Sequence, residues 1–340
     1  MITIKDIAQA AGVTHSTVSR CLNDSPLVSK DTKTRINQLA QEMGYSPNII
    51  ARRLVTRRSR TLGLFFLSRD EVSFMENYGT QFLDGIARRS AERGYDLLFF
   101  TLTKDLANRT SYIKLCKERQ VEGAIFIGVA SDDPHLQEIS HSSLPVGVID
   151  FPMHGPLVGQ VSSDNQKGVL DAMDYLWSLG HRRIGFLRGP LTAPVAQLRF
   201  KSYEDFLKSK RLPGQPWVFQ GDFTRSSGEQ AAQIFSKLPE PPTAVLAAND
   251  LMALGMMKKL KLLGLNIPRD LSIMGFDNAL AAEFSEPGLT TVGQQAGLMG
   301  AGAVDYVVGK LEASPVQLEL LVPPELIIRD SVGEIPSTGA

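Results

Sequence analysis

From residue 61 onward, short apolar runs alternate with longer segments of helical periodicity. The apolar runs lie at 62–67, 97–102, 124–127, 146–149, 184–187, 244–248 and 271–276, and the helical segments at 82–93, 165–179, 199–210, 228–237 and 251–263. Such alternation is typical of parallel sheets that are covered by helices on both faces. At 340 residues the chain is too long for one compact core. The pattern predicts an α/β body of two doubly wound parallel sheets, with a ligand cleft at the carboxyl ends of the strands.

The first sixty residues carry a different pattern, in which short helical segments are separated by turns. Thr3 and Asp6 have the spacing of a helix N-cap and its acidic partner, and Gly12 ends the helix that they open. Thr14 is placed to cap a second helix over residues 15–22. A helix, a short turn containing glycine and a second short helix together make a helix-turn-helix.

A third helix is predicted over residues 30–43. Ser29 caps it and Gly44 stops it, which completes a three-helix head. Residues 48–54 could add about two helical turns beside five arginines. A helix this short is unstable alone and is expected to fold only on a partner surface. The expected domains are a helix-turn-helix head (1–46), a hinge helix with its linker (47–60) and a two-lobed body (61–340).

Charge separates the head from the body. Residues 1–60 contain ten Lys or Arg and four Asp or Glu, a net charge of +6, and the remaining residues carry −6. A basic head on a mildly acidic body indicates a polyanion partner for the head alone. A solvated basic face would give the same charge count, so the helical pattern of the head has to distinguish the two interpretations.

The second predicted helix has polar side chains on its outer face. These are His15, Ser16, Ser19 and Arg20, whereas Val18 faces inward. A helix of this kind fits the major groove of DNA, where its N-terminal residues meet base edges. Arg20 is the candidate for a bidentate contact to guanine. Helix-turn-helix geometry also occurs in proteins that bind no DNA, so further features are needed.

Four segments supply those features: TIKDIAQAAGVTHSTVSRCLNDSPLVS, TKTRI, MGYSPNIIARRL and RSRTLGL. They resemble the lactose-repressor (LacI–GalR) family of transcriptional regulators, and the resemblance continues more loosely over nearly the whole chain. It implies that His15, Ser16 and Arg20 read bases, and that Leu54 of the hinge helix wedges into the minor groove and bends the DNA. It further implies contacts on the phosphate side from Thr3, Thr14, Thr17, Ser19, Asn23, Ser29, Tyr45 and Asn48.

The resemblance also has consequences for the body. It implies a two-lobed fold like that of type I periplasmic sugar-binding proteins, with chain crossings near residues 162, 290 and 322. Lobe one would then hold about 61–162 and 291–322, and lobe two about 163–290 and 323–331. A homodimer is expected, because two recognition helices must meet two half-sites of a double-stranded operator. No heptad run follows ELIIRDS, which favours a dimer over a tetramer.

Polar residues stand at the ends of the predicted strands. Asp150, the pair Asn249 and Asp250, and Asp277 each follow an apolar run, and Arg199 lies near the start of a predicted helix. Carboxylates, an amide and a guanidinium suit a polyhydroxylated ligand, because each hydroxyl both donates and accepts. Any one of them alone would more often be a helix cap or a surface charge. Their repeated placement indicates a binding cleft.

The resemblance supports this cleft and adds to it. It implies that Arg199, Asn249 and Asp277 bind an effector, that Asp150 contacts it from the other lobe, and that Phe223 stacks on it. Phe74 and Tyr78 are further pocket candidates, within a segment that departs from the family's usual pattern. The expected effector is a small molecule, a sugar or a sugar phosphate, that switches the grip on DNA. The chain is therefore predicted to be a sequence-specific regulator, a repressor, of transcription.

Two other functions share parts of this pattern. A sugar-binding transport receptor would need export, yet neither a signal peptide nor a lipid-attachment cysteine occurs at the N-terminus. The two cysteines, Cys21 and Cys116, are typical of a reduced, cytoplasmic protein, and Cys21 is expected in the core of the head. No apolar run approaches the roughly 18 residues that cross a bilayer, so no membrane partner is expected.

An enzyme could use the cleft carboxylates, but the motifs that would support catalysis are missing from the sequence. There is no G-x-S-x-G, no P-loop and no His/Cys cluster with metal-ligand spacing. Gly297, Gly300 and Gly302 do not follow the dinucleotide-binding order, and small residues on a packed helix explain them. No catalytic residue, metal or cofactor is therefore predicted.

Overall fold

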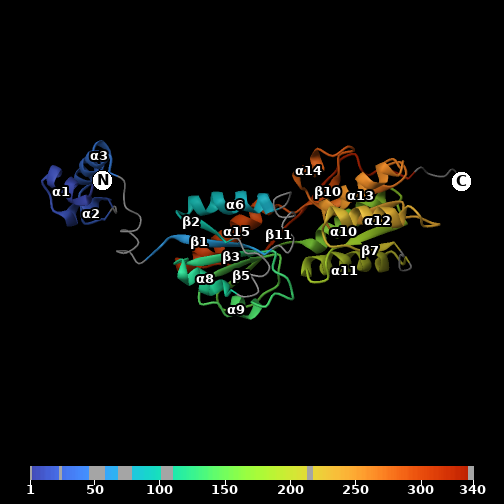
Figure 1. Cartoon of the computed structure of the whole chain (residues 1–340), viewed down its shortest axis with the longest axis horizontal. Helices are drawn as coiled ribbons and strands as arrows, with labels where there is room; N and C mark the ends of the chain where they lie inside the picture. Colours follow the sequence, from blue (N-terminus) through green and yellow to red (C-terminus); the bar gives the residue numbers. More distant parts are fainter. Residues whose placement is uncertain are drawn as a thin grey trace. The chain divides into compact units, whose positions relative to one another are not determined.

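The computed structural model describes residues 2–22, 25–45, 58–67, 79–100, 110–212 and 217–335. The chain divides into two compact units, Met1–Ser59 and Arg60–Ala340 (Figure 1). Five predicted site residues lie outside the described ranges: Asn23, Asn48, Leu54, Phe74 and Tyr78. The hinge helix expected over 48–54 therefore stays a prediction.

The first unit is a bundle of three helices, as predicted. They are α1 (Ile4–Ala11), α2 (His15–Leu22) and α3 (Lys30–Glu42). Their core is formed by Ile7, Val18 and Ile36, which are fully buried, together with Cys21 at 2% exposure. Cys21 therefore packs in the core of the head, as expected.

Local capping explains where the first helix begins and ends. The Thr3 backbone N–H donates to Asp6 Oδ2 at 2.8 Å while the Thr3 hydroxyl caps the Asp6 N–H, a reciprocal capping box. Gly12 ends α1 with φ of 67°, a left-handed conformation that glycine adopts without a steric penalty. The capping signals in the sequence thus predict α1 correctly.

The second unit begins with a six-stranded parallel sheet. Its order is β11-β5-β4-β3-β1-β2, with β1 (Thr61–Phe66), β2 (Asp96–Phe100), β3 (Gly123–Ile127), β4 (Val146–Ile149), β5 (Val158–Ser163) and β11 (Glu319–Val322). Helices α6 (Gly79–Glu92) and α15 (Ala296–Leu311) cover one face, and α8 (Tyr112–Glu118) and α9 (Leu136–Ser140) the other (Figure 1). Strands β3 and β4 are buried throughout, which explains their uninterrupted apolar runs.

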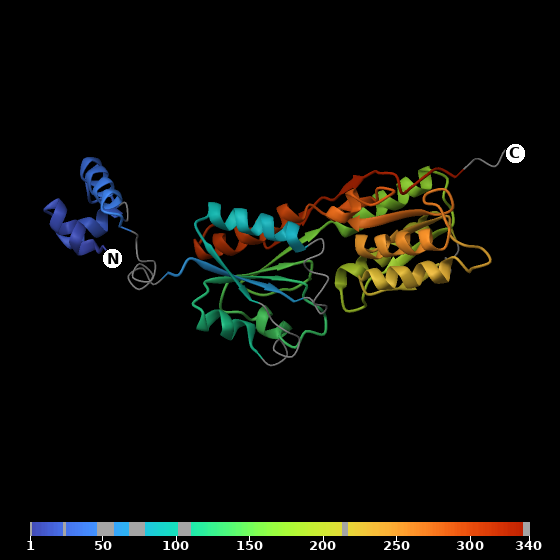
Figure 2. The same ribbon diagram turned by 45° about the horizontal axis from the view of Figure 1, so that its top comes forward.

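A second six-stranded sheet follows in the same unit (Figure 2). Its order is β12-β10-β9-β8-β6-β7, with β6 (Ile184–Arg188), β7 (Val218–Gln220), β8 (Ala244–Ala247), β9 (Ser272–Asp277), β10 (Thr290–Gly293) and β12 (Glu325–Ile327), the last antiparallel to β10. Its helices are α10 (Asn165–Ser178), α11 (Pro194–Ser209), α12 (Arg225–Phe235), α13 (Asp250–Leu262) and α14 (Leu280–Glu283). The two predicted doubly wound sheets are thus confirmed.

The chain passes between the two sheets three times. The crossings follow β5, β10 and β11. Strand β10 runs to Gly293 within the second sheet, so the second crossing comes after residue 293, slightly later than the sequence suggested. Helix α11 begins at Pro194, five residues before its predicted start, so Arg199 lies in the second turn and not at the beginning of the helix.

No helix in the described parts of the chain is long and apolar enough to cross a membrane.

Candidate DNA-binding helix and ligand site

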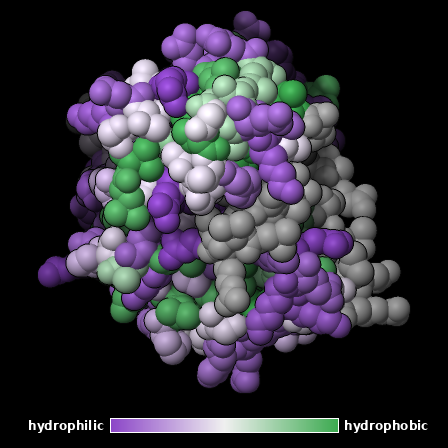
Figure 3. Space-filling model, turned by 90° about the vertical axis from the view of Figure 1, so that its left-hand side faces the viewer, coloured by the Kyte–Doolittle hydropathy of each residue, from purple (hydrophilic) through white to green (hydrophobic). Residues whose placement is uncertain are grey.

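Helix α2 presents the predicted base-reading residues to solvent. His15, Ser16 and Arg20 are exposed, while Val18 and Cys21 on the opposite side of the helix are buried. The helix has only eight residues, and Val18 and Cys21 are its buried side chains. These two side chains therefore fix which face of the helix points inward. The outer face is therefore free to meet another surface. Figure 3 shows hydrophilic residues over much of the visible surface, with hydrophobic ones in small separate groups.

Hydroxyl groups gather at the N-terminus of α2. The Thr14 hydroxyl accepts from the Thr17 N–H at 3.2 Å, and its oxygen lies 2.9 Å from Ser16 Oγ and 2.8 Å from Thr17 Oγ1. The Thr14 cap predicted from the sequence is thus present. A helix N-terminus carries partial positive charge and favours anions such as phosphate.

The other predicted phosphate contacts are spread over the head. Thr3 and Ser29 are exposed and cap α1 and α3, whereas Ser19 and Tyr45 are half-buried. Tyr45 packs against the core of the head. The contacts of these four residues with phosphate stay predictions.

In the second unit, Arg199 is the centre of a buried polar cluster. Arg199 is 2% exposed, and its guanidinium donates from Nε to Asn165 Oδ1 at 2.7 Å and from Nη1 to the Ala248 carbonyl at 2.6 Å. Nη1 also lies 3.7 Å from Asp277 Oδ1, and the guanidinium stacks 3.8 Å from the centre of the Phe276 ring. Arg199 therefore connects α10 with β8 and β9, at the carboxyl ends of these two strands.

Asp277 ends β9 in an unusual backbone conformation, with φ of 129°. Gln294 Nε2 donates to its carboxylate, and burial raises the pKa of Asp277 well above its ordinary value, although Arg199 opposes the rise. Strained backbone of this kind concentrates at functional sites, where the surrounding structure holds it.

Asp150 reaches the same cluster from the first sheet. It follows β4 with φ of 59° and accepts from the Ser162 hydroxyl at 2.8 Å, which in turn lies 3.3 Å from Asn165 Nδ2. Burial raises the pKa of Asp150, and the charge of Arg199 opposes this rise. Hydrogen bonds thus run from Asp150 through Ser162 and Asn165 to Arg199, across the first crossing between the lobes.

Asn249 and Phe223 have structural partners in the same region. Asn249 Oδ1 accepts from the Met252 N–H at 3.0 Å and caps α13, while its Nδ2 donates to the Phe223 carbonyl at 3.0 Å. The Phe223 ring packs so closely over Gly189 that a Cβ there would lie 2.3 Å from a ring atom. Asn249 is therefore a helix cap in this structure, which is one of the two alternatives that the sequence left open. The contact of Asn249 with an effector stays a prediction.

Two further residues belong to the cluster: Asp250, which the sequence placed with Asn249 at a strand end, and Gln294, which was not predicted. Asp250 is fully buried and accepts from the Ala279 N–H at 2.7 Å and the Thr291 hydroxyl at 2.6 Å. Gln294 is 1% exposed, and its Oε1 has no hydrogen-bond partner in the described structure. An unpaired buried acceptor costs about 1–3 kcal/mol, so Gln294 is ready to accept from a bound molecule.

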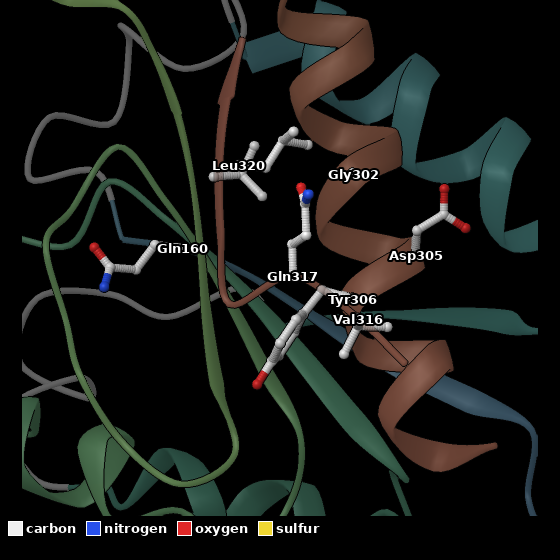
Figure 4. Close-up of a pocket in the computed structure, with 8 residues that line it drawn as sticks. Gln160, Gly302, Asp305, Tyr306, Val316, Gln317 and Leu320 are labelled. Atoms are coloured by element: carbon white, nitrogen blue, oxygen red, sulfur yellow. The ribbon is translucent and has the colours of Figure 1, made fainter. Parts of the chain in front are cut away.

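A groove of about 260 Å³ lies elsewhere, between α15, β5 and β11 (Figure 4). It is lined by Gln160, Val161, Gly302, Asp305, Tyr306, Val316, Gln317 and Leu320. None of the predicted effector residues that the structure describes lines this groove, so it is separate from the Arg199 cluster.

Both units match known families. Residues 3–48 match the model of bacterial regulatory proteins of the lacI family, and residues 173–332 match a periplasmic binding protein-like domain. The HTH-type transcriptional repressor CytR of Escherichia coli (strain K12) is 32% identical over 338 residues, which cover 98% of this chain and 97% of that repressor. The chain belongs to the LacI family. It is a DNA-binding transcriptional regulator.

Other relatives of this LacI-family protein agree. The HTH-type transcriptional repressor PurR of Vibrio vulnificus (strain CMCP6) is 29% identical over 342 residues, 98% of this chain and 100% of that one. A lac repressor dimer bound to operator and the anti-inducer ONPF has a TM-score of 0.80 at 26% identity, covering 98% of this chain and 99% of its own. A complex of the transcriptional regulator CelR with cellobiose has a TM-score of 0.73 at 28% identity, covering 97% and 100%.

Asp250 is expected to make the unfolding free energy of this LacI-family protein depend on pH. Burial raises its pKa from 3.8 to about 6. The folded protein then keeps a proton that the unfolded chain releases. The stabilisation from this group is therefore complete below about pH 4 and is lost as the pH rises to about 6, by on the order of 1 kcal/mol per pH unit.

Urea unfolding of the wild type and of Asp250→Asn between pH 4 and pH 7 measures this effect. The stability difference should move in favour of the variant as the pH rises, because the asparagine does not titrate. Asp84→Asn, which removes an exposed carboxylate paired with Arg88, is the control and should follow the wild type. A difference between wild type and Asp250→Asn that is constant over this range would contradict the raised pKa.

Proposed function

We propose that the chain is a repressor of transcription that binds a pseudo-palindromic operator as a homodimer and changes its operator affinity when a small polyhydroxylated effector occupies the Arg199 cluster. The observation that carries the proposal is the hydrogen-bonded path from Asp150 to Arg199. It links the two lobes at the ends of their strands, where ligands bind in such folds. An effector that bridges the two ends of this path would favour one arrangement of the lobes over another.

The head supports the operator part of the proposal. Its three helices pack into a separate unit, and the exposed face of α2 carries His15, Ser16 and Arg20. The +6 charge of residues 1–60 supplies the attraction to phosphate that all DNA binding requires. Related repressors compared above include one bound to its operator as a dimer.

Exposed apolar side chains in lobe two support the dimer. Leu280 of α14 is 66% exposed, Phe284 directly after that helix is 76% exposed, and Ile328, which follows β12, is 58% exposed. Burying such side chains against a second copy would contribute about 1.5–3 kcal/mol each. We propose this surface as part of the dimer contact.

The effector is proposed to be a sugar or a similar polyol. Carboxylates from both lobes, an amide acceptor and a guanidinium converge in the cluster, and hydroxyl groups can satisfy all of them. One structural relative is described as a complex with cellobiose. We assign no catalytic role to the cluster, since the relatives are repressors, and we propose that the protein acts in the cytoplasm, where its operator lies.

Selection of operators from random DNA tests the first part of the proposal. The wild type should enrich a two-fold symmetric sequence, and Arg20→Ala should lose the preference at one symmetric position. Loss of a bidentate contact to guanine costs roughly 1–3 kcal/mol per half-site. Lys5→Ala, which removes an exposed charge from α1, is the control and should leave the enriched sequence unchanged. An unaltered motif for Arg20→Ala would remove this residue from base reading.

A further inference from the structure

Arg60 is the first residue of the second unit, to which the chain from the head is joined. It stands within the RSRTLGL segment, directly before β1, and neither the base-reading helix nor the Arg199 cluster gives it a role. Its backbone has φ of 47°. This left-handed conformation is unfavourable for a residue with a Cβ and persists only where neighbouring contacts hold it.

Two residues at the starts of neighbouring strands hold the Arg60 backbone. The Arg60 N–H donates to Glu122 Oε1 at 2.8 Å, and the Arg60 carbonyl accepts from the Asp96 N–H at 2.8 Å. The Glu122 N–H in turn donates to the Thr61 carbonyl at 2.9 Å. Glu122 therefore binds this part of the chain twice, once through its backbone and once through its carboxylate.

These contacts lie at the amino-terminal end of the first sheet. Strand β1 lies between β2 and β3 (Figure 1), Asp96 is the first residue of β2, and Glu122 directly precedes β3. The three strands are parallel, so their starts lie at the same end of the sheet. Asp150 follows β4 at the opposite, carboxyl-terminal end. The contacts of Arg60 are therefore separate from the ligand site.

The Arg60 side chain adds a weaker contact. Its Cζ lies 5.8 Å from the centre of the Tyr95 ring, near the outer limit of a cation–π contact, and the Arg60 side chain is exposed. A hydrogen bond from a backbone N–H to a carboxylate is among the stronger ones in proteins. The bond from the Arg60 N–H to Glu122 is thus the principal side-chain contact that holds Arg60 in its conformation.

We propose that Glu122 is a positioning residue for operator binding, which acts through the backbone N–H of Arg60. By holding Arg60 in its left-handed conformation, the carboxylate fixes where, and in which direction, the chain to the head joins the first lobe. This role requires no contact between Glu122 and DNA. The proposal rests on the proposed binding of a dimer to two half-sites and names a residue of the body that controls it.

A fixed attachment strengthens operator binding because the two heads of a dimer have to reach two half-sites. Once one head is bound, the second binds with an effective concentration that depends on the length and stiffness of its connection to the body. Release of Arg60 lengthens the free connection and adds backbone freedom that operator binding must remove again. Operator affinity should then fall, whereas the binding of single heads to non-specific DNA should change little.

Glu122→Ala and Glu122→Gln in the full-length protein test the proposal. The probe is the operator that the wild type enriches from random DNA, and a shuffled sequence of the same length measures non-specific binding. Glu122→Ala should bind the operator at least about fivefold more weakly, with unchanged non-specific affinity. Glu122→Gln keeps an acceptor oxygen for the Arg60 N–H and should match the wild type in both measurements.

Glu118→Ala is the matched control. It removes a carboxylate from the same lobe, where Glu118 Oε1 lies 3.9 Å from Lys114 Nζ at the end of α8. Each alanine variant makes the body less negative, which by itself favours binding to phosphate. A loss of operator affinity in Glu122→Ala alone therefore cannot come from the change in charge. Equal operator affinity of Glu122→Ala and the wild type would overturn the proposal.

Two Arg60 variants test the same contact from its other side, and they decide the matter if Glu122→Ala does not fold. Arg60→Gly and Arg60→Pro both remove the guanidinium. Glycine adopts positive φ readily and keeps the N–H, whereas proline has no N–H and holds φ at about −65°. Arg60→Pro should therefore bind the operator at least about fivefold more weakly than Arg60→Gly. Equal affinities of these two variants would contradict the positioning role.

The double variant and the melting temperature separate positioning from stability. Adding Glu122→Ala to Arg60→Pro should cause no further loss of operator affinity, because both changes remove the same hydrogen bond. A Glu122→Ala protein that melts well below the wild type but keeps its operator affinity would leave Glu122 a structural role alone. If the wild type enriches no two-fold symmetric operator, the proposed function fails and this proposal with it. If it enriches one and all variants bind it normally, only the positioning role fails.

Discussion

A chain that begins at residue 61 is expected to stay folded, to dimerise and to bind effector, but to lose operator binding completely. The head has its own core around Ile7, Val18 and Ile36, and the body forms a separate unit. Residues 1–60 carry a charge of +6 and the rest −6, so the truncated chain would also repel DNA. Gel shift assays measure the loss, and analytical ultracentrifugation measures the dimer.

The salt dependence of full-length binding provides the control. Operator affinity of the intact chain should fall steeply with rising salt, as phosphate contacts release counterions. Effector affinity of the intact and truncated chains should be the same within error. Specific operator binding that survives in the truncated chain would show that the body, and not the head, reads DNA.

Arg199→Ala is expected to abolish the response to effector and to destabilise the body. The substitution leaves Asn165 Oδ1 and the Ala248 carbonyl without their donor, and Asp277 without its cationic partner, in a buried setting. Removing one partner from a buried charge pair costs about 3–5 kcal/mol of stability. Each lost charged hydrogen bond to an effector would cost a further 1.5–3 kcal/mol, roughly, in binding. Operator binding without effector should persist, because the head folds separately.

Urea unfolding, calorimetry and a gel shift with and without effector measure the three effects. Arg182→Ala is the control: this arginine is exposed and lies over the Trp177 ring, 3.6 Å from its centre. The control should lose little stability and respond normally to effector. An effector affinity of Arg199→Ala equal to that of the wild type would remove Arg199 from the effector site and leave it a structural role alone.

The path through Asn165 connects the two lobes of the body at the first crossing. Asn165 is the first residue of α10, directly after the crossing from β5, and is 1% exposed. Three hydrogen bonds therefore connect Arg199 through Asn165 and Ser162 with Asp150 in the other lobe. Because packed cores are not continuously deformable, a small shift at such a joint favours movement of one lobe as a whole.

Local signals in the sequence predicted much of this architecture. Thr3, Thr14 and Ser29 stand where the three head helices begin, because capping depends on residues within three positions of one another. The buried strands β3 and β4 were recognisable from uninterrupted apolar runs. Pro194 was an unused signal: proline at the first position of α11 marks the true start of that helix.

The short edge strands were harder to recognise from the sequence. Strands β11 and β12 contain exposed charged residues, Glu319 and Glu325, and each is only a few residues long. Edge strands bury one side at most, so their hydrophobic pattern is faint. Their membership in different sheets follows from the third crossing and could not be derived from their own residues.

By itself, the sequence determined the head, the alternation of the body, the family and the residue types at the strand ends. Only the tertiary structure decided how those residues meet. Gln294 carries no local signal, and its place beside Asp277 arises because parallel pairing aligns the ends of β10 and β9. In the same way, Arg199 pairs with Asn165 and Ala248, far away in sequence, because α10 and α11 begin where β8 ends. Capping is local, whereas the electrostatics of a buried cluster depend on every charge that the fold brings within reach.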